Sequence, residues 1–221
     1  MRIDLNHQVH SFGSDRTHVP NWHQSVDRWY QLDEAAYGLV DTYFHCLSKL
    51  FSRPDFIILA SPAASNHTDF EFVKSGAISP SLFVHTLPNI RSAPLLQAME
   101  WTGPILCLQA GIRTLLSGCV EAIEMAARYE QNVWILSVFQ NRKDQQNEVH
   151  ILELLGGKRS TEKKPNYEVV LTDSLAKYEA SRVDSDLIHW LCKRPDENEF
   201  DLSPAIKIAR RNKFDMNEER N

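Results

Sequence analysis

A strongly amphipathic segment between two short apolar runs constrains the fold of this chain more than any other feature. Residues 112–129 place their apolar side chains along one helical stripe, and charged residues such as Arg113 and Glu124 fall on the opposite side. Apolar runs at 105–108 and 133–139 flank this segment, and such runs are typical of strands that are buried on both faces of a sheet. The order strand, helix, strand predicts a parallel βαβ unit whose helix packs on the sheet.

Other segments extend this unit into a larger α/β domain. The sequence predicts helices over 33–51 and 176–192, and strands over 55–60, 149–155 and 167–171. With 221 residues and 43% hydrophobic content, the chain can bury one sizeable core, and its length favours a single domain. We therefore expect a mostly parallel sheet that is flanked by helices.

The last part of the chain has a different composition. Residues 193–221 carry many charges and few large apolar groups, which is typical of segments that cannot bury a core. We expect one domain over residues 1–192 and a charged, flexible C-terminal tail over 193–221.

The charge and hydropathy of the chain argue against several classes of function. The formal net charge is −5 and the pI is near 6.0. No continuous positive field would attract a phosphate backbone, so nucleic-acid binding is not expected. No apolar run approaches the ~20 residues that a membrane span requires, and residues 1–16 are too polar for a secretory signal. We expect no membrane span and a cytoplasmic location.

The cysteines show no pattern of a disulfide framework or of a metal site. No CxxC pair is present, and most of the cysteines lie in apolar stretches of sequence, which favours reduced and buried thiols. The cysteines are Cys46, Cys107, Cys119 and Cys192.

Four histidines, His7, His10, His18 and His23, stand near the start of the chain. Their spacing fits no compact metal template, and their polar surroundings favour solvated side chains. The sequence therefore predicts no metal site and no other cofactor.

A further set of motifs surrounds the first strand of the βαβ unit. The sequence SPSLFVHTLPN at 79–89 begins with a Ser-Pro pair that starts a helix. The sequence TGPILCLQAG at 102–111 ends in two small residues, Ala110 and Gly111, which form an elbow before the long helix. With the strand at 55–60, the order is a strand, a Ser-Pro helix, a Gly-Pro turn, a small-residue elbow, a helix and another strand.

This order resembles the N-terminal half of the β-ketoacyl synthase family, which has the thiolase-like fold. The resemblance covers about residues 21–139. Within the family, the chain most resembles the short ketosynthase-like N-terminal-domain proteins found near fatty-acid, polyketide and aryl-polyene gene sets. The resemblance implies a thiolase-like half-fold, because fully active members of the family are roughly twice as long and add a second half of the same topology. A sheet edge and an active-site floor would then be completed by a partner or by self-association, or would stay open.

The resemblance also implies a catalytic set that this chain lacks. In the family, a cysteine beside the elbow, at a helix N-terminus, is the nucleophile, and two histidines of the C-terminal half stabilise the oxyanion and the enolate. Alignment on the elbow glycine puts Leu108 at the nucleophile position, and alignment on the Gln-Ala-Gly triplet puts Gln109 there. A glutamine at this position resembles the chain-length-factor partners of type II polyketide synthases.

Two other residues are weaker candidates for chemistry. Cys107 stands one or two positions upstream of the nucleophile position, but its apolar neighbours favour a buried core thiol. His85 lies in the segment that shapes the substrate pocket in the family, but no cysteine or aspartate stands at a triad spacing from it.

The resemblance therefore implies a non-catalytic ketosynthase-like subunit without a catalytic residue of its own. Such a subunit would act in acyl-carrier-dependent fatty-acid, polyketide or aryl-polyene biosynthesis by pairing with an active ketosynthase or an acyl carrier protein. A homodimer would complete the sheet in another way. The alternative is a stand-alone acyltransferase or thioesterase that uses Cys107 or His85, and a structural or regulatory protein without an acyl ligand is a third hypothesis.

Overall fold

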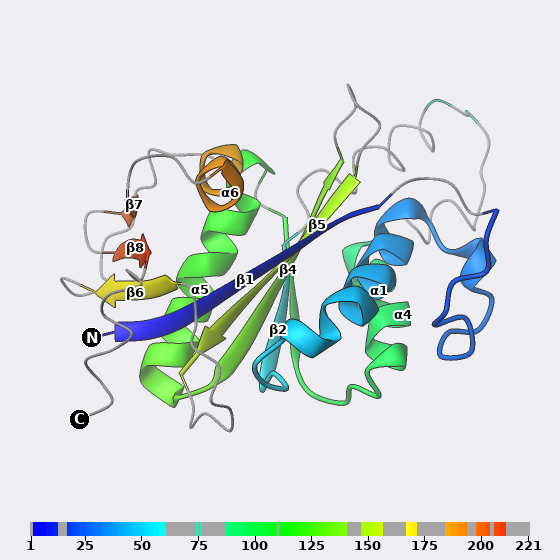
Figure 1. The fold of residues 1–221 in the computed structure, drawn as a ribbon, viewed down its shortest axis with the longest axis horizontal. Coiled ribbons are helices and arrows are strands. Elements are labelled where there is room, and N and C mark those ends of the chain that lie inside the picture. Colours follow the sequence, from blue (N-terminus) through cyan, green and yellow to red (C-terminus); the bar gives the residue numbers. More distant parts are fainter. Residues whose placement is uncertain are drawn as a thin grey trace.

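One mixed sheet organises the molecule (Figure 1). The computed structural model describes residues 2–12, 17–60, 74, 76, 87–109, 111–140, 147–156, 167–171, 184–193, 198–203 and 206–210. The strands are β1 (Arg2–Phe12), β2 (Phe56–Ala60), β3 (Ile105–Leu108), β4 (Asn132–Gln140), β5 (Asn147–Leu155), β6 (Tyr167–Leu171), β7 (Glu199–Ser203) and β8 (Ile206–Arg210). The α-helices are α1 (Glu34–Cys46), α4 (Pro88–Ala98), α5 (Thr114–Tyr129) and α6 (Asp184–Lys193), and the 3-10 turns are η1 (Trp29–Gln31), η2 (Leu47–Lys49) and η3 (Gly111–Arg113).

The strand order in the sheet is β3-β2-β4-β5-β1-β6-β8-β7. Among the described strands, β2 pairs in parallel with β3 and with β4, and every other ladder is antiparallel. The predicted α/β class and the βαβ unit from β3 through α5 to β4 are confirmed. The prediction of a mostly parallel sheet is wrong, because β5 returns directly beside β4 and β1 pairs antiparallel to β5.

Helices cover both faces of the sheet (Figure 1). In this view the sheet is seen nearly edge-on, with α5 and α6 on its left and α1 and α4 on its right. Leu115, Leu116 and Ile123 of α5 are completely buried against β2, β4 and β5. Burial of each such side chain contributes about 1.5–3 kcal/mol, so the amphipathic stripe of α5 accounts for its position on the sheet.

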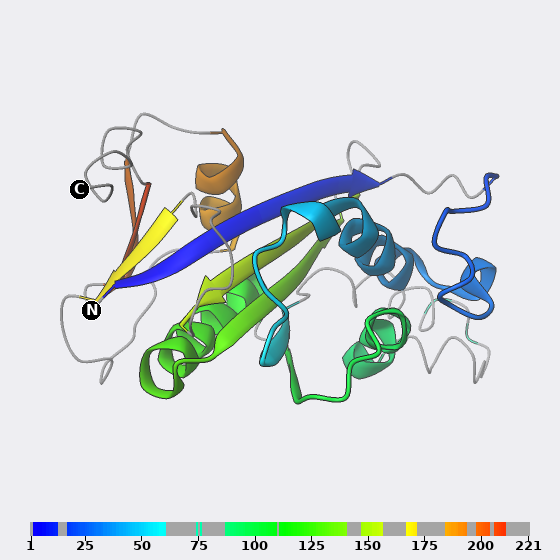
Figure 2. The same ribbon diagram turned by 60° about the horizontal axis from the view of Figure 1, so that its bottom comes forward.

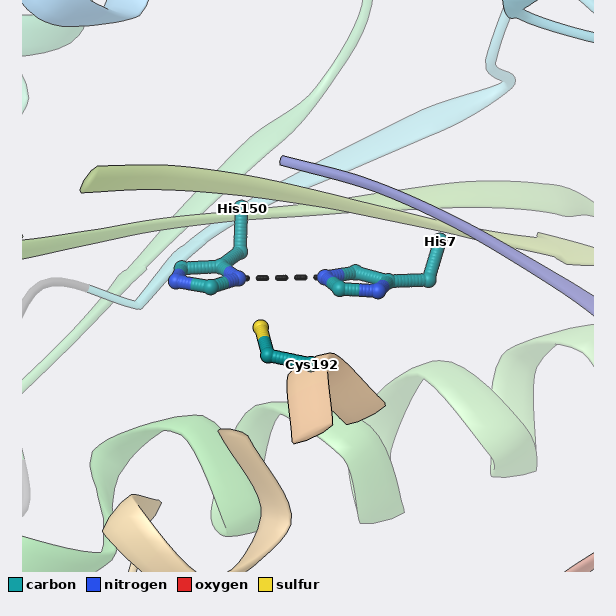
Figure 3. A group of neighbouring side chains, drawn as sticks. All are labelled: His7, His150 and Cys192. Carbon is teal, nitrogen blue, oxygen red and sulfur yellow. Dashed lines mark hydrogen bonds between the residues drawn. The ribbon is translucent and has the colours of Figure 1, made fainter. Parts of the chain in front are cut away.

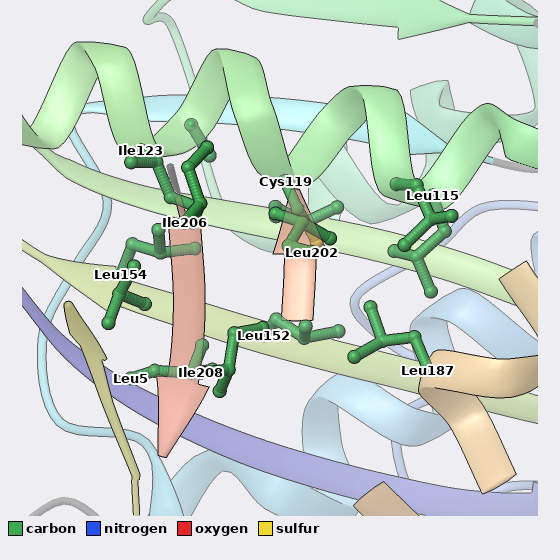
Figure 4. Packing of buried hydrophobic residues seen from close by; sticks show 14 of the residues in the cluster. Leu5, Leu115, Cys119, Ile123, Leu152, Leu154, Leu187, Leu202, Ile206 and Ile208 are labelled. Atoms are coloured by element: carbon green, nitrogen blue, oxygen red, sulfur yellow. The ribbon is translucent and has the colours of Figure 1, made fainter. Parts of the chain in front are cut away.

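The predicted boundary between the domain and the C-terminal tail, at residues 192 and 193, differs from the structure. β7 and β8 lie within 193–221, where the sequence predicts a flexible tail, yet their apolar side chains enter the core that α5 and α6 share (Figure 4). These side chains are buried and comprise Phe200, Leu202, Ile206 and Ile208. The tail prediction is therefore wrong for 198–203 and 206–210, because alternate apolar residues in these short strands reach the core. Residues 211–221 lie outside the described residues.

The N-terminal strand β1 is another departure from the expectation. It is the long blue strand in Figure 2 and lies inside the sheet between β5 and β6. Ile3, Leu5 and His7 point to the same face, and all three are buried. The prediction of a solvated side chain is wrong for His7, whereas His18 and His23 are exposed as expected. Residues 3, 5, 7 and 9 alternate with polar residues, which is the pattern of a strand with one buried face. The pattern was missed because one of these four residues, His7, is itself polar.

Candidate functional site

The predicted elbow follows the carboxyl end of β3, at the end of the sheet where the parallel strands β2, β3 and β4 have their carboxyl ends. β3 stops at Leu108, and the chain turns through Gly111 into η3 and α5. Gly111 has φ +60°, a left-handed conformation that side chains with a Cβ adopt at a cost. The other elbow residue, Ala110, lies outside the described residues. The carboxyl ends of parallel strands are the usual place for a site in open α/β sheets, so the geometry agrees with the predicted location.

The backbone at Gly111 gives a first prediction. We expect Gly111→Ala to lower the free energy of unfolding by about 1–2 kcal/mol, because a Cβ is disfavoured at this positive φ although no atom lies close enough to clash with it. Gly111→Asn should cost less, since asparagine tolerates the left-handed region. Urea unfolding of the two variants measures this difference, and equal stabilities for glycine, asparagine and alanine at this position would contradict the assigned conformation.

The two candidates for the nucleophile position differ in environment. Leu108 is half-buried and packs against the core on the α5 side of the sheet, whereas Gln109 is exposed beyond the end of β3. Neither side chain carries a nucleophile. The histidine candidate, His85, lies outside the described residues.

Cys107 points away from the start of α5. It packs against the core on the α1 and α4 side, and its neighbour Leu108 packs on the α5 side, as the alternation of a strand requires. Burial raises the pKa of the Cys107 thiol. A nucleophilic thiol needs a lowered pKa from a helix N-terminus or a cation, and Cys107 has neither benefit.

The N-terminus of α5 is occupied by a carboxylate from a distant part of the chain. Asp184, the first residue of α6, accepts a hydrogen bond at Oδ2 from Leu115 N and one at Oδ1 from Leu116 N, both at 2.9 Å. Asp184 is only 3% exposed. Burial raises the pKa of Asp184, and the hydrogen bonds from the α5 amides oppose that shift. Two amides of the first turn of α5, which could otherwise bind an anion, are therefore already engaged by Asp184.

The far end of α6 contributes to a separate cluster. Cys192 lies in the last turn of α6, next to His7 of β1 and His150 of β5, and their potential ligand atoms all lie within 4.8 Å of one another. Burial, followed by the proximity of His150, lowers the pKa of His7 to about 3, so this ring is neutral near pH 7. Sequence spacing missed the cluster because its members come from three separate elements.

A pocket of about 370 Å³ lies near the amino ends of β2 and β4, at the other end of these strands from the elbow. Its walls include the segment before β2 and the start of β4, and the lining residues are Tyr43, Leu47, Leu50, Phe51, Ser52, Arg53, Met99 and Trp134. The pocket therefore contains no residue of the predicted site.

Thiol reactivity tests the placement of Cys107. With iodoacetamide near neutral pH and EDTA present, we expect Cys192 to react before Cys107 because it is more exposed, since burial raises the pKa of both thiols. The buried Cys46 and Cys119 should react last. Burial raises the pKa of the Cys119 thiol strongly. Peptide mass spectrometry over time gives the order. Modification of Cys107 as rapid as that of Cys192 would support a reactive thiolate and contradict the buried placement.

The two edges of the sheet differ in their chemistry. β7 forms one edge and carries Glu199 and Asp201, both exposed and both close to Lys207 of β8. β3 forms the other edge, consists of Ile-Leu-Cys-Leu and is half-buried throughout. Charged side chains on an edge strand prevent further pairing, and an apolar edge permits it. Among the described residues, the outer side of β3 pairs with no strand.

The outward backbone groups of β3 follow from its ladder with β2. Ile57 N donates to Pro104 O at 3.3 Å. Because bonded residues alternate in a parallel ladder, the N–H and C=O groups that point away from β2 belong to Ile105 and Cys107. Four positions after the end of β3, Ile112 of η3 is 69% exposed. The elbow is therefore preceded by an apolar edge strand and followed by an exposed apolar side chain.

Comparison with known proteins supports the fold alone. No protein-family model and no curated protein matches the chain. Among solved structures, the chain is similar to one from a ketosynthase, ApeO, in complex with its chain length factor, ApeC, from Xenorhabdus doucetiae. The TM-score is 0.59, the sequences are 14% identical, and the similarity covers 96% of this chain and 100% of that chain. The chain has a ketosynthase-like α/β fold, as the sequence predicted.

No helix in the described part of the chain is both long and apolar enough to cross a membrane.

Proposed function

We propose that this chain is a non-catalytic β-ketoacyl synthase-like subunit that pairs with an active ketosynthase in acyl-carrier-dependent fatty-acid, polyketide or aryl-polyene biosynthesis. The observation that carries the proposal is the environment at the start of α5. The residues before α5 offer no thiol at the nucleophile position, and Asp184 accepts hydrogen bonds from the amides of Leu115 and Leu116 in its first turn.

The chemistry of condensation explains why this observation matters. A catalytic cysteine needs a site that favours a thiolate, and a helix N-terminus provides one through its free N–H groups and its dipole. A carboxylate bound at those N–H groups consumes the hydrogen bonds and repels a second anion. Acyl transfer through this elbow is therefore disfavoured twice: no thiol is present, and two amides that could stabilise a thiolate or an oxyanion already bond Asp184.

The β3 edge supports a role as one half of a pair. An apolar edge strand is a template for another strand, and within the described ranges the outer side of β3 has no strand beside it. The exposed side chain of Ile112, four positions after β3, adds an apolar group at the elbow. The nearly complete mutual coverage with the matched chain means that both chains have similar lengths. In the proposed pair, an active ketosynthase would supply the catalytic groups.

The alternative of a stand-alone acyltransferase or thioesterase has less support. Cys107 lies on the sheet face opposite α5, and burial raises the pKa of its thiol. A second copy of the chain could also pair along β3, which would give a homodimer without a catalytic cysteine. In the proposed pair with a ketosynthase, an acyl carrier protein would dock on the assembled pair and would not deliver an acyl group to this chain.

Co-expression tests the pairing directly. The chain is produced with a full-length ketosynthase encoded beside an acyl carrier protein, and the mixture is separated by size exclusion with mass determination by light scattering. We expect one peak with the mass of a heteromeric pair. Separate elution of the two proteins at all concentrations would contradict the partner proposal, and a stable homodimer that excludes the ketosynthase would favour self-association.

A further inference from the structure

His7 and His150 meet edge to edge on one face of the sheet (Figure 3). In the β1–β5 ladder, His7 stands opposite Leu152 and His150 stands opposite Val9, so the two histidines are diagonal neighbours. His7 Nε2 lies 3.0 Å from His150 Nδ1. The ring centroids are 5.3 Å apart and the planes differ by 5°, so the rings are nearly coplanar and a nitrogen of each faces the other.

Cys192 approaches this pair from α6. Its side chain points toward the hydrogen bond between the rings, and the three donor atoms all lie within 4.8 Å of one another (Figure 3). A tetrahedral zinc ion, with Zn–N of about 2.0–2.1 Å and Zn–S of about 2.3 Å, holds its donor atoms about 3.3–3.6 Å apart. The two nitrogens lie slightly closer together than this, and the sulfur lies within 4.8 Å of both, so metal binding requires the rings to move apart and turn toward a common point.

Groups around His150 match the surroundings of a metal ligand. His150 is completely buried, and its Nε2 lies 3.4 Å from Glu148 Oε2 with no closer hydrogen-bond partner. Metal-binding histidines commonly direct their second nitrogen to a carboxylate, which fixes the ring and raises its basicity. Ser137 stands opposite His150 in the β4–β5 ladder, and its buried Oγ has no hydrogen-bond partner in the described part of the chain.

We propose that His7, His150 and Cys192 form a Zn²⁺ site that fastens α6 to the sheet. Two imidazole nitrogens and one thiolate suit a borderline-soft ion and are poor ligands for Mg²⁺ or Ca²⁺. Three protein donors leave a fourth position for water or another ligand. The site is separate from the elbow and does not depend on the proposed ketosynthase partner.

Zinc at this place would act on both ends of α6. Cys192 lies in the last turn of the helix, and Asp184, its first residue, bonds the start of α5. Binding of zinc to the native state stabilises that state according to the ratio of free zinc to its dissociation constant. A fixed α6 therefore keeps the Asp184 carboxylate at the elbow.

Zinc titration of the full chain after EDTA treatment tests the site. We expect binding of one Zn²⁺ per chain by calorimetry, and Cys192→Ser should weaken the affinity by about tenfold or more, since a bound thiolate is lost. Cys192 is exposed, so this variant should fold. Cys107→Ser is the matched cysteine control and should bind zinc like the unmodified chain. No stoichiometric binding, or equal affinity in Cys192→Ser, would overturn the proposal.

Two further readouts separate the site from adventitious binding. Co²⁺ in place of Zn²⁺ should give a thiolate-to-cobalt charge-transfer band in the near ultraviolet, and Cys192→Ser should abolish it. Zinc should also slow amide hydrogen exchange in α6 and at the amides of Leu115 and Leu116. A cobalt spectrum without the thiolate band would assign the metal to surface histidines and overturn the proposed site.

Discussion

Asp184→Ala is expected to lower the free energy of unfolding by about 2–3 kcal/mol. The substitution removes both hydrogen bonds at the start of α5 and leaves Leu115 N and Leu116 N without their acceptor in a buried place. Loss of a helix cap costs about 0.5–2 kcal/mol, and a buried donor left without an acceptor costs about 1–3 kcal/mol. Urea unfolding followed by circular dichroism measures the change.

Asp186→Ala is the matched control for this prediction. Asp186 lies in the same first turn of α6 and is exposed, so its loss should cost well below 1 kcal/mol, or about the value of a surface charge near a helix N-terminus. Asp184→Asn keeps an acceptor oxygen and should fall between the two. If Asp184→Ala were no less stable than Asp186→Ala, the carboxylate would not be the cap of α5.

Ile112→Glu is expected to weaken association with the ketosynthase partner by at least about tenfold. Ile112 is an exposed apolar side chain of the elbow, four positions after β3, and a charge placed there would be desolvated if the partner covers the elbow. The fold should be unaffected, because the side chain is 69% exposed. Size exclusion of the co-expressed pair, followed by titration of the separate proteins, gives the affinity.

Tyr129→Glu provides the control at the other end of α5. Tyr129 is 66% exposed, which nearly equals the exposure of Ile112, but it lies away from the elbow. We expect Tyr129→Glu to pair like the unmodified chain. Equal losses for both variants would mean a general effect of charge, and equal retention would remove the β3 side from the interface.

Sequence periodicity predicted the elements that have strong, uniform patterns. The stripe of α5 and the apolar runs of β2 and β4 gave the correct parallel unit, since burial of these side chains dictates the period. The elbow was placed by small residues, and its positive φ at Gly111 agrees with that choice. The sheet direction beyond β4 could not be read, because a buried strand has the same composition in parallel and antiparallel ladders.

Polar residues in buried places account for the remaining errors. β1 carries Asp4, Asn6 and His7, all buried, and the side chains of Asn6 and His7 bond to Glu153 and His150 of β5, far along the chain. The Asp184 cap and the histidine pair likewise join residues more than 60 positions apart. Local spacing contains no trace of such contacts, so the cap and the Cys192 cluster became visible only in the fold.

Acylation of a reconstituted pair tests the central claim, which is that this chain has a ketosynthase-like shape without the chemistry of one. The chain, an active ketosynthase and their mixture are each incubated with acyl carrier protein that bears a labelled acyl group, and the mass of every protein is measured. We predict an acyl adduct on the ketosynthase alone, none on this chain, and condensation that increases when the two are paired. An acyl adduct on this chain, lost in Cys107→Ser, would contradict the account.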